Sequence, residues 1–164
     1  MVAPLYTSDE RRRRDESPWT LVQGVLAPLQ FLVFLVSLAL VLRFLWTGEG
    51  ATAAAVSVVV KTLVLYTIMV TGSLWEKAVF GRYLFARPFF WEDVFSMAVL
   101  ALHTAYLVAL ATGALGTTGQ MWLALAAYAA YLINAAQFVL KLRAARLQDR
   151  TRRSERSTQL GATA

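Results

Sequence analysis

Four long apolar runs, separated by short polar stretches, dominate the hydrophobic pattern of the chain. They cover residues 21–42, 51–74, 94–111 and 121–140. The first run alone would form about 33 Å of α-helix, which is enough to cross the hydrocarbon core of a bilayer. The pattern therefore predicts an all-α integral membrane protein built as a four-helix bundle.

The tryptophans support these four boundaries. All five fall at the ends of the runs, at Trp19, Trp46, Trp75, Trp91 and Trp122. Tryptophan prefers the boundary between lipid and water, so this distribution is typical of membrane-spanning helices. In the stretch from Trp75 to Asp93, a tryptophan is followed by one or two acids at each end. We interpret this stretch as the loop that returns the chain into the membrane, on the working face of the molecule.

The basic residues predict the orientation. Four arginines precede the first run, three basic residues lie in the central loop, and seven lie between Lys141 and Arg156. The short turns after Trp46 and Ala111 have none. By the positive-inside rule, we expect both termini and the central loop to face the cytoplasm.

The domain organisation is expected to be simple. Neither a polar linker nor a repeat divides the chain, so residues 1–147 are predicted to form one four-helix domain. The first run is too long for a signal peptide and is interpreted as a retained anchor. Residues 148–164 form a basic polar tail, predicted to be disordered. The basic residues from Lys141 to Arg156 would attract anionic lipid headgroups, and they lack the interleaved aromatic residues that stack on nucleic-acid bases.

Composition excludes several classes of chemistry. Hydrophobic residues make up 58% of the sequence and charged residues 16%, which is too apolar for a soluble domain of this size. There are no cysteines, so disulfides, thiolate nucleophiles and cysteine-ligated metal sites are excluded. The glycine spacing from Gly113 to Gly119 lacks the preceding strand and the lysine of a phosphate-binding loop, so we expect a simple turn there.

Polar residues inside the apolar runs are the candidates for function, because they are costly in a membrane and tend to face the bundle interior. Gln30, Lys61 and His103 are expected near the middle of the bilayer. A second set is expected toward the cytoplasmic side: Gln23, Glu76, Glu92, Asp93, Asn134 and Gln137. The sequence thus predicts two polar layers in one bundle.

The third run links these layers. Glu92 and His103 are separated by a rotation of about 20° and an axial distance of about 16 Å, so they share a helix face but cannot hydrogen-bond to each other. This spacing suits a large flat ligand held at two points. His103 is either an interhelical hydrogen-bonding group or, in the sharper interpretation, an axial ligand to a pigment metal or a proton donor.

Lys61 and the three acids have alternative interpretations. No acid lies inside any run to pair with Lys61, which therefore snorkels, loses its proton or meets an anionic ligand. Glu76, Glu92 and Asp93 lie at an interface where solvated carboxylates are ordinary. Burial beside aromatic residues would instead keep one of them protonated, as a general acid at neutral pH requires.

Four stretches of the sequence also carry a family resemblance: LYTSDERRRRDESPWTLVQGVLAPLQFLVFLVSL, KTLVLYTIMVTGSLWEKAVFG, FFWEDVFSMAVLALHTAYL and YLINAAQFVLKLRAARL. Together they resemble the 3-vinyl bacteriochlorophyllide hydratase family of bacteriochlorophyll biosynthesis, over about Leu5 to Leu147. The resemblance implies a hydro-lyase that adds water to the 3-vinyl group of a chlorophyllide-type ring, giving a 1-hydroxyethyl group. It assigns no catalytic residues, so the site residues are predicted from position alone.

The resemblance completes the set of expectations. Glu92, Asp93 and Glu76 are predicted to be catalytic, and His103, Lys61, Asn134 and Gln30 to bind substrate, with His103 as a possible axial ligand to the substrate's magnesium. No cofactor of the protein's own is expected. The expected partners are the chlorophyllide substrate, water and the lipids of a bacterial inner or intracytoplasmic membrane, with no nucleic acid. A homo-oligomer or a complex with other enzymes of the pathway stays open. The alternative function is a non-catalytic pigment-binding or assembly subunit of the photosynthetic apparatus.

Overall fold

The computed structural model describes residues 5–162, and this part of the chain is all-helical. The elements are α1 (Ser8–Glu16), α2 (Pro18–Thr47), α3 (Ala51–Phe80), a short 3-10 helix η1 (Arg87–Phe89), α4 (Phe90–Thr112) and α5 (Gly116–Ala162). The segments Pro18–Thr47, Ala51–Phe80, Arg87–Thr112 and Gly116–Gln148 are long and apolar enough to cross a membrane. The all-helical fold and the four apolar helices are therefore confirmed.

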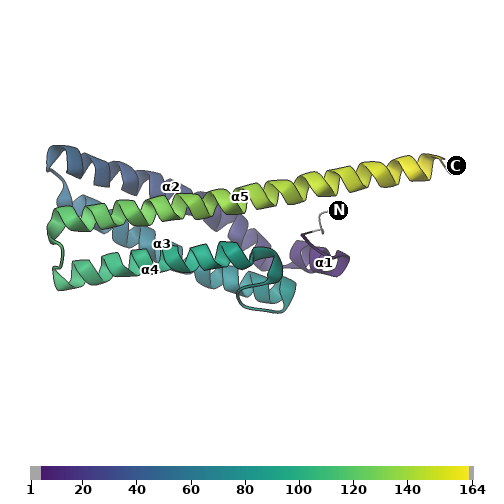
Figure 1. Cartoon of the computed structure of the whole chain (residues 1–164), viewed down its shortest axis with the longest axis horizontal. Helices are drawn as coiled ribbons and strands as arrows, with labels where there is room; N and C mark the ends of the chain where they lie inside the picture. Colours follow the sequence, from purple (N-terminus) through teal and green to yellow (C-terminus); the bar gives the residue numbers. More distant parts are fainter. Residues whose placement is uncertain (1–4, 163–164) are drawn as a thin grey trace.

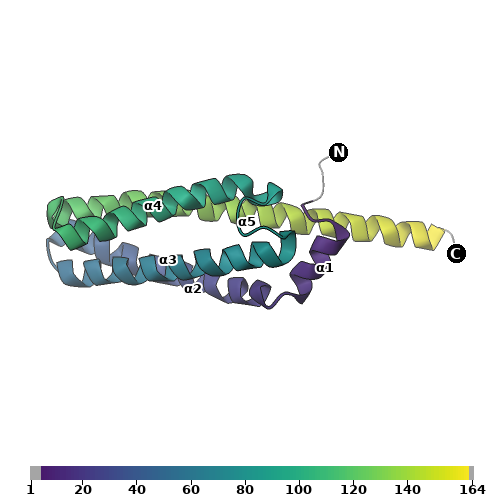
Figure 2. The same ribbon diagram turned by 90° about the horizontal axis from the view of Figure 1, so that it is seen from below.

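The four long helices form two hairpins that pack side by side. α2 packs along α3, α4 packs along α5, and α5 also contacts α2 and α3 (Figures 1 and 2). Most contacts lie within each hairpin, so α3 and α4 are more loosely joined to each other. We call the end with α1, η1 and the α3–α4 loop the polar end, and the opposite end the turn end. α5 continues beyond the polar end as a single helix to Ala162 (Figure 1).

Glycines close the turn between α2 and α3. Gly48 and Gly50 have φ angles of 74° and 82°, in the left-handed region that other residues adopt only at a cost. The predicted turn after Trp46 is thus confirmed. Pro28 lies inside α2, which stays helical through it.

Small side chains bring the helices close together. Ala54 of α3 and Ala124 of α5 are fully buried, and Ala127 is 1% exposed. Ala54 and Ala124 pack in a core with larger residues such as Phe34 and Tyr128, whose rings meet edge to face. Small side chains such as these let neighbouring helices approach closely.

Enlarging Ala124 is expected to destabilise the bundle. Ala124→Leu adds three carbons where no space exists, which should cost about 1–3 kcal/mol of folding free energy. Ala126→Leu is the matched control, because Ala126 is exposed on the outside of the same helix. Thermal unfolding in detergent should show a lower midpoint for the first variant and an unchanged midpoint for the second. Equal midpoints would contradict this packing.

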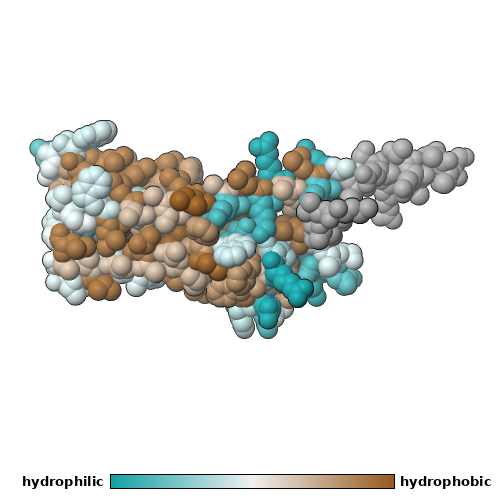
Figure 3. Space-filling model, viewed as in Figure 1, coloured by the Kyte–Doolittle hydropathy of each residue, from teal (hydrophilic) through white to brown (hydrophobic). Residues whose placement is uncertain are grey.

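The outer surface carries the apolar band expected for a membrane protein. Hydrophobic residues cover most of the bundle, and hydrophilic residues gather at the polar end (Figure 3). Trp46, Trp91 and Trp122 are 87%, 67% and 61% exposed near the ends of their helices, as expected for tryptophans at the boundary between lipid and water. Trp75 is instead partly buried, and its indole N–H donates to Thr20 Oγ1 at 2.9 Å.

The N-terminal segment folds back over the polar end. α1 begins with a capping box between Thr7 and Glu10, a feature that the sequence analysis did not identify. The preceding Tyr6 is 3% exposed and stacks on Phe80, with ring centroids 5.8 Å apart. Phe89 lies beside both rings. This aromatic cluster closes the polar end of the bundle.

Candidate active site

Two carboxyl groups meet where α3 ends and α4 begins. Glu76 in the last turns of α3 and Asp93 in the first turn of α4 are neighbours, because the adjacent loop residues Ala86 and Phe85 each bind one of them through a backbone N–H. They are 5% and 3% exposed. Two buried carboxylates this close would repel each other, and a proton on one of them relieves that repulsion. We call these residues the acid pair, and their burial and closeness favour one proton shared between them.

The backbone of the α3–α4 loop holds both acids in place. The N–H of Phe85 donates to Asp93 Oδ2 at 2.7 Å, and the N–H of Ala86 donates to Glu76 Oε2 at 3.2 Å. Phe85 has a φ of 59°, a left-handed conformation that is costly for a residue with a side chain. Its bond to Asp93 compensates for this strain, so the loop and the acid pair are built as one unit.

Glu92 has different surroundings from the acid pair. Lys141 of α5 donates to Glu92 Oε2 at 2.6 Å, and the two side chains are 27% and 11% exposed. Glu92 thus lies in an ion pair with a cation from another helix, whereas Glu76 and Asp93 lie next to another acid. The three acids predicted as a group fall into two chemical types.

A polar chain continues inward from Glu92. Ser96 Oγ donates to the carbonyl of Glu92, and Asn134 Nδ2 donates to Ser96 Oγ, both at 2.8 Å. The side-chain oxygens of Asn134 and Gln137 are buried without a hydrogen-bond partner. Each can accept a hydrogen bond from a water molecule or a ligand. Asn134 and Gln137 thus lie near Glu92, as expected for members of the polar layer on the cytoplasmic side.

The deep layer also exists, and it is closed to the outside. Gln30 is 3% exposed, and Lys61 and His103 are fully buried. Lys61 does not snorkel, because its Nζ lies 3.9 Å from the centroid of the Tyr131 ring inside the bundle. His103 Nδ1 lies 2.8 Å from the Val99 carbonyl and must donate to it, so Nε2 keeps a free lone pair. Gln30 Oε1, Lys61 Nζ and His103 Nε2 have no hydrogen-bond partner.

Glu92 and His103 share one face of α4, as predicted. The structure nevertheless separates the residues that were predicted to act together. Glu92, Ser96, Val99 and His103 all lie on the buried side of α4. The acid pair, the Glu92–Lys141 pair with Asn134, and the deep layer form three distinct groups. Sequence reasoning puts Lys141 on one face of the fourth run with Tyr131 and Asn134, a stripe more often packing than a site, and does not pair it with Glu92. The backbone donors of Phe85 and Ala86 also leave no mark in the sequence.

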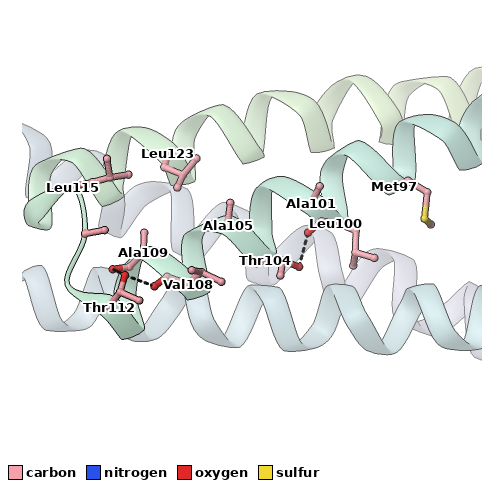
Figure 4. A pocket seen from close by; sticks show the side chains of 11 residues that line it. Met97, Leu100, Ala101, Thr104, Ala105, Val108, Ala109, Thr112, Leu115 and Leu123 are labelled. Carbon is pink, nitrogen blue, oxygen red and sulfur yellow. Dashed lines mark hydrogen bonds between the residues drawn. The ribbon is translucent and has the colours of Figure 1, made fainter.

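A lipid-facing groove runs along α4 from Met97 toward the turn end (Figure 4). Its volume is about 650 Å³, and its lining is mainly Leu100, Ala101, Thr104, Ala105 and Val108 of α4, with Leu115 and Leu123 on the side of α5. Thr104 also bonds to Tyr66 of α3 at 2.7 Å. Met97 stands one helical turn after Asp93, so the groove begins beside the acid pair. None of the three acids lines it.

Metal binding by the protein itself receives no support from side-chain clusters. Among the residues whose side chains the structure describes (5–148, 150 and 151), no group of three or more histidine, aspartate or glutamate residues is placed to hold a metal ion.

Comparisons with known proteins agree on one family. A family model described as 2-vinyl bacteriochlorophyllide hydratase matches residues 6–144. A protein of that name from Rhodobacter capsulatus is 69% identical over 144 residues, covering 88% of this chain and 84% of that protein. Another of that name from Cereibacter sphaeroides is 66% identical over 143 residues, covering 87% of this chain and 89% of that protein. No solved structure matches the chain.

Proposed function

The chain belongs to the 2-vinyl bacteriochlorophyllide hydratase family and is a hydro-lyase of bacteriochlorophyll biosynthesis; on this premise we propose that the acid pair protonates the vinyl group. The names 2-vinyl and 3-vinyl describe the same substituent in two numbering schemes for the ring. The observation that carries the proposal is the burial of Glu76 and Asp93 together under one loop, because two neighbouring buried carboxyl groups favour keeping one proton, here near a lipid-facing groove. A general acid at neutral pH needs such a proton.

The chemistry requires a proton first and water second. The acid pair gives its proton to the terminal CH₂ carbon of the vinyl group, which becomes a methyl group. The two π electrons of the vinyl bond form the new C–H bond, and the carbon attached to the ring becomes positive. Conjugation with the ring spreads this charge. The oxygen of a water molecule then bonds to that carbon, and loss of one proton from the water leaves the 1-hydroxyethyl product.

Glu92 is proposed to hold and deprotonate the attacking water. Its ion pair with Lys141 provides a carboxylate that can accept a proton, and Glu92 directly precedes Asp93 in the first turn of α4, which puts it close to the acid pair. The unpartnered Asn134 Oδ1 is a second acceptor for the same water. Transfer of the accepted proton from Glu92 to the acid pair would restore the starting state. These steps need no metal or cofactor of the protein's own, and the magnesium belongs to the substrate.

The ring is proposed to lie in the groove on α4. A volume of about 650 Å³ is within the roughly 300–1,000 Å³ of typical small-molecule sites. An apolar lining suits a flat macrocycle that arrives through the lipid. The end of the groove at Met97 would bring the vinyl edge to the acid pair, once the loop that carries Phe85 moves aside. Access therefore depends on the loop that also holds the two carboxyl groups.

The substrate-binding roles predicted for Gln30, Lys61 and His103 stay predictions. About 15 Å of helix separates Asp93 from His103, and the deep layer is closed off in the bundle interior. A ring whose vinyl group meets the acid pair would reach these residues only if α3 and α4 part. α3 and α4 contact each other less than the helices within each hairpin do, so we expect the bundle to open between them.

The orientation in the membrane is part of the proposal. The basic residues of the central loop and of the segment after Lys141 belong to the polar end, whereas the two turns of the turn end have none. The positive-inside rule then puts the polar end, the acid pair and both termini on the cytoplasmic side of a bacterial inner or intracytoplasmic membrane.

Filling the groove should block the ring without unfolding the protein. Ala105→Phe places a bulky side chain in the middle of the groove, and we expect the KM for the vinyl pigment to rise by roughly tenfold, a loss of about 1.4 kcal/mol in binding. Ala111→Phe is the control, because Ala111 is exposed on the same helix outside the groove lining. Conversion of vinyl to hydroxyethyl pigment is followed by absorbance and chromatography. Unchanged KM in Ala105→Phe would rule the groove out as the binding site.

A further inference from the structure

A second hollow opens at the polar end, beside the α3–α4 loop. It has a volume of about 240 Å³ and is lined by Glu10, Phe80, Arg82, Ala86, Arg87 and Pro88. Both arginines are exposed, and neither forms an ion pair with any carboxylate whose side chain the structure describes. Glu10 already accepts the N–H of Thr7 in the capping box. The hollow therefore presents two guanidinium groups that lack an anion.

The hollow and the acid pair share a structural element. Ala86 lines the hollow, and its backbone N–H binds Glu76. Phe80 lies one helical turn after Glu76 on α3 and forms another wall. An extended molecule held at the acid pair by one edge would therefore have a neighbouring edge close to the two arginines.

We propose that this hollow binds the free propionate carboxylate of the tetrapyrrole substrate. The inference rests on the proposed function, because it takes the acid pair as the place where the vinyl group reacts. A chlorophyllide carries its propionate on the pyrrole-derived ring next to the one that bears the vinyl group. Its macrocycle prefers lipid and its carboxylate prefers the headgroup region. A reaction site at the polar end lets the same molecule satisfy both preferences.

Arginine suits this role better than the buried lysine does. A guanidinium group binds a carboxylate through two parallel hydrogen bonds and is always charged. Lys61, for which the sequence also allows an anionic ligand, lies about 22 Å along α3 from Glu76. That distance exceeds the separation of two neighbouring edges of one macrocycle. The apolar walls formed by Phe80 and Pro88 would cover the methylene groups of the propionate arm.

The experiment compares two substrates that differ only in this carboxylate. The vinyl pigment is supplied as the free acid and as its methyl ester to full-length wild type and to the Arg82→Gln/Arg87→Gln double variant in native membranes. We expect the KM for the free acid to rise about tenfold in the double variant, with kcat within about twofold. The KM for the ester should be the same in both proteins. Arg143→Gln, on the exposed side of α5, should match wild type with both substrates.

The outcomes decide between the propionate and other anions. Equal increases in KM for acid and ester would mean that the arginines bind a lipid phosphate or support the loop, and would overturn the proposal. An unchanged KM for the free acid would overturn it as well. Arg82→Lys/Arg87→Lys should recover part of the preference for the free acid, because it keeps the positive charge. The acid-to-ester ratio does not depend on which carboxyl group donates the proton, so active variants of the acid pair would refute the mechanism and leave this test intact.

Discussion

Glu76→Gln and Asp93→Asn are each expected to lower the rate of vinyl hydration by about 100-fold or more, the range in which general acids contribute. Either substitution removes one of the two oxygens between which the proton is shared. The folded structure should survive, because an amide N–H can donate to the remaining carboxyl group and the amide oxygen can accept the N–H of Phe85 or Ala86. The measurement is the initial rate of hydroxyethyl pigment formation at saturating vinyl pigment.

The controls for the acid pair are acids elsewhere in the chain. Glu49→Gln lies at the turn end, where Glu49 and its partner Arg43 are exposed, and it should leave the rate unchanged. The double variant should be little slower than either single variant, because both substitutions remove the same shared proton. Wild-type rates in both single variants, with normal thermal stability, would show that the proton comes from another group. If the two substitutions lowered the rate independently, so that the fold-losses multiplied in the double variant, the two carboxyl groups would not share one proton.

Lys141→Gln is expected to destabilise the protein and slow the reaction, whereas Glu92→Gln/Lys141→Gln should regain stability and stay slow. Removing Lys141 alone leaves the largely buried Glu92 carboxylate without its cation, at a cost of about 1–3 kcal/mol. For a chain of this size, each kcal/mol lowers the thermal midpoint by about 2–4 °C. Neutralising both partners removes that unpaired charge. The slow rate persists because the water then lacks its base.

Thermal unfolding and pigment conversion, measured on the same preparations, separate the two roles of Glu92. Lys77→Gln is the control, because the exposed Lys77 contacts only the Gly81 carbonyl and the Tyr83 ring among the described residues, and neither is an acid. If the double variant recovers both stability and full rate, Glu92 is a structural partner of Lys141 and takes no part in catalysis. If Lys141→Gln is as stable as wild type, the ion pair contributes nothing to the fold.

Periodicity along one helix was enough to predict which residues share a face. The rotation of 100° per residue put Glu92, Ser96, Val99 and His103 together, and all four are buried in the bundle. The same reasoning could not divide the three acids into a protonated pair and an ion-paired carboxylate. Glu92 and Lys141 are 49 positions apart, and their contact depends on how α4 and α5 are rotated against each other.

The N-terminal segment shows the same limit. The sequence of residues 5–16 is polar and predicts only a group of arginines next to the first helix. In the structure Tyr6 fills a place between Phe80 and Phe89, and α1 forms one wall of the hollow that contains Arg82 and Arg87. A single tyrosine in a polar stretch has no periodic partner, so its burial could not be inferred.

The sequence by itself determined the four apolar helices, the turn after Trp46 and the two levels of polar residues, because hydrophobicity and helical periodicity act over neighbouring positions. The turn expected from Gly113 to Gly119 is shorter, because α5 begins at Gly116. The tertiary structure alone decided that Glu76 meets Asp93, that Glu92 meets Lys141 and that Lys61 stays inside under Tyr131. Those contacts join different helices. Their geometry depends on how small residues such as Ala54 and Ala124 let the helices approach, and on the path of the loop through Phe85 and Ala86.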